Sequence, residues 1–138
     1  MLRLNRPAHA LATEIVPLNR SAMDQELEQA RIKHLAFKSK VRALLHGAEM
    51  ETEVLLSEAE CALGKWITET GRKLFSHFPE LAELEKAHLQ LHRIVEKLVD
   101  LCRLNQFEDA QKGMTEVEEI SSLLTHILEN MDKRLKAT

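Results

Sequence analysis

The sequence predicts an all-α protein, an antiparallel four-helix bundle preceded by a flexible N-terminal arm. Only four glycines and three prolines occur in 138 residues, so few positions interrupt a helix. Apolar residues recur at spacings of three and four over three long stretches, which is typical of helices that bury one narrow face. Short connections between these stretches favour antiparallel neighbours. We therefore expect one domain over residues 21–138, after an arm over residues 1–20 that contains two prolines.

The first helix is expected to begin near Ser21, which precedes Asp24 by three residues, as in a capping box. Its apolar seam consists of Leu27, Ala30, His34, Phe37, Val41, Leu44 and Ala48. Gly47 and the polar residues that follow predict a turn. The second helix is expected over residues 54–70, with apolar residues on a front wide enough to touch more than one neighbour.

Gly71 is expected to end the second helix, and Pro79 to open the third. The third seam consists of Leu81, Leu84, His88, Leu91, Val95, Leu98 and Cys102. Asn105 and Gln106 interrupt the pattern before the fourth helix. The fourth seam consists of Phe107, Ala110, Met114, Val117, Ser121, Leu124, Leu128, Met131 and Leu135.

Composition excludes several classes of function. The formal net charge is −3 and no basic stripe is present, which argues against nucleic-acid binding. No apolar run approaches the ~18 residues of a membrane span, and the N-terminus has no secretory h-region. The two cysteines are then expected as reduced thiols, and the cytoplasm is the expected compartment.

Four residues form a candidate zinc site: His34, Cys61, His88 and His92. The midpoint between His34 and Cys61 is 47.5, beside Gly47. The midpoint between Cys61 and the histidine pair is 75.5, between Gly71 and Pro79, where the helical pattern breaks a second time. Positions equally distant from a turn face one another in an antiparallel pair, so folding at both breaks brings all four to one level. Three imidazoles and a thiolate complete a tetrahedral zinc site.

Taken singly, each of these residues also has an ordinary structural explanation. A histidine on a seam is more often a satisfied core residue, and a lone cysteine is more often a small buried apolar group. Cys102 lies three turns beyond His92 and is expected in the core. Glu85 and His88 form a single Glu-x-x-His unit, whereas di-iron bundles need two, so that class is disfavoured.

The segment Cys61-Ala-Leu-Gly-Lys-Trp66 resembles the signature of the bacterial chemoreceptor zinc-binding domain, the CZB family. The resemblance extends over about residues 30–98. It implies a helical bundle, usually homodimeric, with zinc ligands at His34, Cys61, His88 and His92. Phe37 departs from the tryptophan that the family commonly has three residues after the first histidine. Gly64 is expected to let another helix approach the metal, and Trp66 to pack nearby.

The function that this resemblance implies is sensory and regulatory, not enzymatic. Zinc occupancy, oxidation of Cys61, or both would alter helix packing and control an unknown signalling partner of the chemoreceptor or diguanylate cyclase type. Four protein ligands leave no open position for an activated water. The alternatives are a structural zinc-stabilised adaptor and, less favoured, a small catalytic metalloprotein.

Overall fold

The computed structural model describes residues 20–137, so the expected N-terminal arm lies outside the described residues apart from Arg20. All regular structure in this part of the chain is helical, which confirms the all-α class. The segments are α2 (Arg20–Leu45), α3 (Glu53–Leu56), α4 (Ala62–Trp66), the π-helix η1 (Ile67–Gly71), α5 (Arg72–Leu74), α6 (Glu80–Arg103), α7 (Phe107–Lys112) and α8 (Met114–Ala137).

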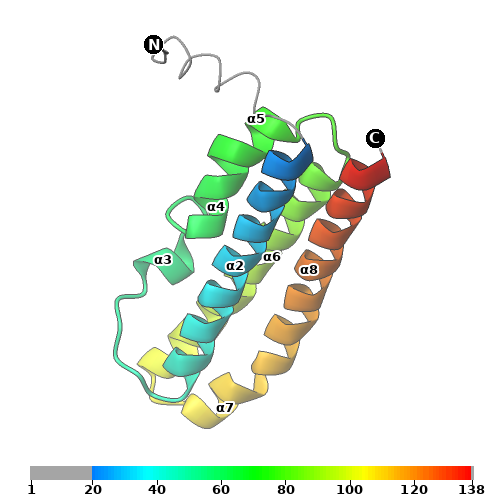
Figure 1. Cartoon of the computed structure of the whole chain (residues 1–138). Helices are drawn as coiled ribbons and strands as arrows, with labels where there is room; N and C mark the ends of the chain where they lie inside the picture. The colour runs from blue at the N-terminus through cyan, green and yellow to red at the C-terminus, as the bar shows by residue number, and fades with distance from the viewer. Residues whose placement is uncertain (1–19, 138) are drawn as a thin grey trace, which may run out of the picture.

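The chain runs alternately down and up the bundle (Figure 1). Helix α2 descends, the segment α3–α4–η1–α5 returns, α6 descends and α8 returns. As a result, α2 and α6 run in the same direction, and each has an antiparallel neighbour in α8. The fourth position of the bundle is filled by the short, interrupted run from α4 to α5.

The expected seams form the core. In α6 every seam position from Leu81 to Cys102 is buried, and in α8 every seam position from Val117 to Leu135 is buried. Val41, Val95 and Val117, one from each long helix, have no exposed surface. Burying each such side chain contributes ~1.5–3 kcal/mol, so packing accounts for most of the driving force for this bundle.

The prediction of one continuous second helix was wrong. Residues 57–61 leave the helix, and Cys61 itself has extended backbone, with φ −66° and ψ 142°. The Ser57 hydroxyl accepts the Glu60 N–H at 3.3 Å, a local bond that competes with helix formation. Gly71 does not end the segment, which continues to Leu74. A side chain at Gly71 would meet Leu81 at 3.0 Å, so tight packing explains this glycine.

Three other boundaries also differ from expectation. Ser21 lies within α2 and is not its cap. The seam of α2 ends before Ala48, because Gly47 adopts φ +94° and turns the chain. Gly113 divides the expected fourth helix into α7 and α8. The break at Asn105, where φ is +60°, is confirmed.

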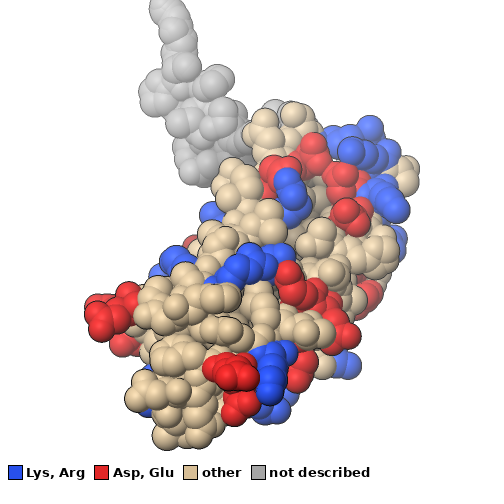
Figure 2. Space-filling view, turned by 90° about the horizontal axis from the view of Figure 1, so that it is seen from below, with Lys and Arg blue, Asp and Glu red and all other residues tan. Residues whose placement is uncertain are grey.

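The surface is mixed in charge. On the face shown in Figure 2, basic and acidic side chains are interspersed over the end of the bundle. In the described part of the chain, no helix is long and apolar enough to span a membrane.

Candidate metal centre

Three of the four expected ligands meet in the core. Cys61, His88 and His92 bring their ligand atoms within 4.8 Å of one another, and all three side chains are buried. Cys61 comes from the start of α4, and the two histidines lie one turn apart on α6. The Nε2 atoms of His88 and His92 are 3.1 Å apart. This is close to the ~3.3 Å separating two nitrogens that each lie ~2.05 Å from a tetrahedral zinc ion.

His92 is held in the tautomer that leaves its Nε2 free to bind a metal. Its Nδ1 lies 2.8 Å from the carbonyl oxygen of Leu55, and a carbonyl can only accept. Nδ1 therefore carries the proton, and Nε2 presents a lone pair toward His88. Such an outer hydrogen bond is the usual support of a metal-binding histidine. The Phe37 ring packs on His92, with 4.8 Å between ring centroids, and fixes the imidazole from the other side.

Cys61 occupies the N-cap position of α4. Burial raises the pKa of its thiol, while the backbone N–H groups of Leu63 and Gly64 oppose that shift. Burial prevails, so the metal-free thiol stays protonated at neutral pH. Coordination to a divalent cation removes this proton, because the thiolate is the ligand form.

Gly64 allows the site to close. A Cβ at this position would lie 1.6 Å from the Glu58 carbonyl oxygen and 3.1 Å from Cε1 of His88. The expectation that another helix would approach here is thus only partly met, since the closest neighbour is the connection before Cys61. Trp66 packs against Phe75, and its Nε1 donates to Glu26 at 3.2 Å.

The histidines are neutral in the fold. Burial lowers the pKa of His88 to about 3, with smaller contributions from the neighbouring His92 and His34. Burial likewise lowers the pKa of His92. Neutral imidazole is the form that binds zinc. The donor set, its protonation and its spacing therefore fit the metal.

His34 is fully buried but lies outside the group formed by the other three residues. Its Nε2 is 2.6 Å from the Ser121 hydroxyl on α8, and its Nδ1 has no hydrogen-bond partner. Burial, followed by the charge of Lys38, lowers the pKa of His34 to about 4. A role for His34 as the fourth ligand stays a prediction.

Two grooves border the site. One, of about 330 Å³, reaches Cys61 and is lined by Lys33, Lys40 and Lys65. The other, of about 250 Å³, reaches His88 on the side of Glu58.

Reasoning from the sequence missed two groups here. The Leu55 carbonyl is a backbone atom and leaves no signal in a sequence. Ser121 was placed on the fourth seam without a role, although a hydroxyl among apolar seam residues was a usable signal. Of the other histidines, His46, His77 and His126 are exposed, and His9 lies outside the described residues. Cys102 lies in the core as expected.

Residues 34–99 match the family model described as the chemoreceptor zinc-binding domain, which confirms the resemblance seen in the sequence. The match contains all four expected ligands and ends before α7 and α8. Neither a curated protein nor a solved structure matches the chain.

Proposed function

We propose that this chain, whose residues 34–99 match the chemoreceptor zinc-binding domain family, is a zinc-responsive regulatory module of bacterial signalling. The observation that carries the proposal is the buried group of Cys61, His88 and His92. His34 is the proposed fourth ligand. When bound, zinc would supply one divalent centre that joins residues of α2, α4 and α6 at one level of the bundle.

The segment around Cys61 would link the state of the metal site to helix packing. Cys61 stands where the chain leaves the Ser57 turn and enters α4, so loss of its metal bond would release a connection that lies outside regular helix. The π-helix η1 follows α4 directly, and such segments frequently occur at functional sites. Loss of zinc, or oxidation of the Cys61 thiolate to a sulfenic acid, would shift α6 relative to α2 and α4.

A shift of α6 can act as a signal only if another protein responds to it. By family resemblance we propose a homodimer acting on a chemoreceptor or diguanylate cyclase type of output, in the cytoplasm. Two free cysteines are compatible with that reducing compartment. The proposed site has no catalytic role, because four protein ligands fill a tetrahedral zinc.

A structural adaptor is the second candidate, and the deep burial of all three grouped ligands favours it. The two grooves that reach Cys61 and His88 favour the sensory function instead, because they bring solvent close to the ligands. Zinc that resists both strong chelators and oxidants would select the adaptor.

Native mass spectrometry of the purified chain tests the proposal. The wild type should carry one zinc per chain, and both Cys61→Ser and His92→Gln should lose it. His126→Gln is the matched control, because this histidine is exposed and far from the group in sequence. Equal zinc content in all four proteins would refute the assignment.

A further inference from the structure

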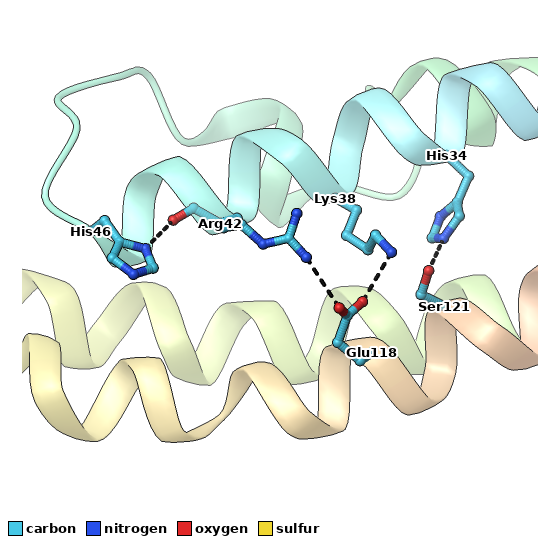
Figure 3. Close-up of polar contacts among 6 residues, drawn as sticks. All are labelled: His34, Lys38, Arg42, His46, Glu118 and Ser121. Atoms are coloured by element: carbon cyan, nitrogen blue, oxygen red, sulfur yellow. Dashed lines mark hydrogen bonds and ion pairs between the residues drawn. The ribbon is translucent and has the colours of Figure 1, made fainter.

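A buried hydrogen bond links His34 of α2 to Ser121 of α8 (Figure 3). The Nε2–Oγ distance is 2.6 Å, and the two side chains are 0% and 3% exposed. The two residues are 87 positions apart, and Ser121 lies outside the segment matched by the family model. The Ser121 hydroxyl lies among the apolar seam residues of α8, and it provides a hydrogen-bond partner for the buried His34 ring.

The second nitrogen of His34 has no such partner. Nδ1 is buried without any hydrogen bond. A neutral imidazole carries its proton on only one nitrogen. If that nitrogen were Nδ1, a buried N–H would be left unsatisfied, which destabilises the fold. With the proton on Nε2, the N–H donates to Ser121, and Nδ1 holds a free lone pair.

His34 stands at the level of the metal group. Phe37 contacts His92, and His34 precedes Phe37 by one turn of α2 just as His88 precedes His92 by one turn of α6. Because α2 and α6 run in the same direction (Figure 1), these equal offsets place His34 and His88 at the same level of the bundle. His34 also contributes to the lowered pKa of His88.

We propose that Ser121 is a positioning residue for the metal centre: it accepts the Nε2–H of His34, leaves Nδ1 as the fourth metal-binding atom, and connects metal occupancy to α8. This inference rests on the proposed zinc function. Outer hydrogen bonds of this kind orient the ring and strengthen it as a ligand. Ser121 thereby extends the site beyond the matched segment, onto a helix that supplies no ligand.

A second contact holds the same two helices together one turn away. Glu118 of α8 lies 2.9 Å from Lys38 and 3.1 Å from Arg42 of α2 (Figure 3). His46 in turn bonds the Arg42 carbonyl at 2.9 Å. The charges of Lys38 and Glu118 act on the His34 ring in opposite directions. Arg42 instead meets Glu118 where both side chains are about half exposed, and it makes no contact with the ring. Removing the Arg42 side chain therefore provides a control for general loosening between α2 and α8.

The test compares the full chain with Ser121→Ala, Ser121→Thr and Arg42→Ala. Zinc affinity is measured by competition with a chromophoric chelator, and the His34 tautomer by long-range ¹H–¹⁵N spectra of the imidazole. We expect Ser121→Ala to weaken zinc binding by about 10- to 100-fold. Ser121→Thr keeps a hydroxyl and should restore most of the affinity, and Arg42→Ala should leave it unchanged.

In the wild type the metal-free spectrum should show the proton on Nε2 of His34, and zinc binding should change the ¹⁵N chemical shift of Nδ1. Zinc should also slow amide exchange around residues 117–125, but not in Ser121→Ala. A proton on Nδ1, zinc on Nε2, or wild-type affinity in Ser121→Ala would overturn the inference while leaving the zinc function intact. A wild-type chain that binds no zinc would overturn both. The wild-type spectra decide the matter even if a variant fails to fold.

Discussion

Substituting Gly64 by alanine should destabilise the metal centre. The added Cβ would lie 1.6 Å from the Glu58 carbonyl oxygen, whereas real Cβ atoms essentially never approach a neighbour within 3.0 Å. The backbone of residue 58 must therefore retreat by at least about 1.4 Å, because a main-chain atom cannot rotate out of the way. Cys61 follows three residues later and must move with it.

Two effects oppose one another in this variant. Alanine favours the helix over glycine by ~0.8–1.0 kcal/mol. Overpacking costs ~1–3 kcal/mol and more where the backbone has to shift, so destabilisation prevails. Zinc sites tolerate only about ±0.2 Å in ligand distance, so displacement of Cys61 should lower zinc affinity by at least about tenfold.

Gly113→Ala provides the control. A Cβ there would lie 2.3 Å from Cδ2 of Leu98, the end of a flexible side chain. Gly113 follows α7, which lies at the far end of the bundle from α5 (Figure 1). This substitution should lower the free energy of unfolding without changing zinc affinity. Urea unfolding and chelator competition measure the two quantities. If Gly64→Ala binds zinc as tightly as the wild type, the connection before Cys61 does not set the ligand geometry.

Four further outcomes are expected. After chelation, circular dichroism should keep most of its helical signal while amide exchange rises around residues 30–38 and 85–95, and complete unfolding would instead make zinc structural. Light scattering should give about twice 15.8 kDa, and a monomer at every concentration would contradict the dimer. In the metal-free chain, mass mapping after alkylation should find Cys61 modified before Cys102, because Cys61 lines a groove that borders the site and Cys102 lines neither of the two grooves. Prior modification of Cys102 would argue against access of the reagent through that groove. The folded pKa values of about 4 for His34 and about 3 for His88 lie below the unfolded value of ~6.5. The unfolded chain therefore binds more protons than the folded chain below pH 6.5. The free energy of unfolding of the metal-free chain should fall from pH 6.5 toward pH 4, by up to ~1.4 kcal/mol per pH unit for each histidine, and should stay level above pH 7. Urea unfolding that gave equal stability at pH 5 and 7.5 would exclude buried neutral histidines.

The sequence predicted the long helices well because their periodicity reflects burial directly. The seam of α6 and the break at Asn105 follow from local pattern alone. The second helix was mispredicted because non-helical contacts within residues 57–64 decide it. The Glu58 carbonyl packs on Gly64, and the Ser57 hydroxyl takes the place of a helical bond. No periodicity in residues 54–70 reports such contacts.

The spacing of the candidate ligands predicted the level at which they lie in the bundle but not their hydrogen-bond partners. Equal distances from two turns placed His34, Cys61, His88 and His92 at one level, and the structure brings the last three together. The His34 ring is hydrogen-bonded to Ser121, which is 87 residues away. A spacing argument fixes the height of a residue along the bundle but not the partner that its side chain selects.

The two grooves beside the ligands have a kinetic consequence. The groove at Cys61 is lined by three lysines and Glu60, whereas the one at His88 carries Glu58, Glu85 and Arg72. Arg72 is neutralised by Glu85, at 3.1 Å, which leaves the charge of Glu58 facing the histidine side. Anions are therefore attracted to the sulfur and cations to the imidazoles. Added salt should slow the arrival of both, each at its own entrance, so a single buried centre would have two separately tunable association rates.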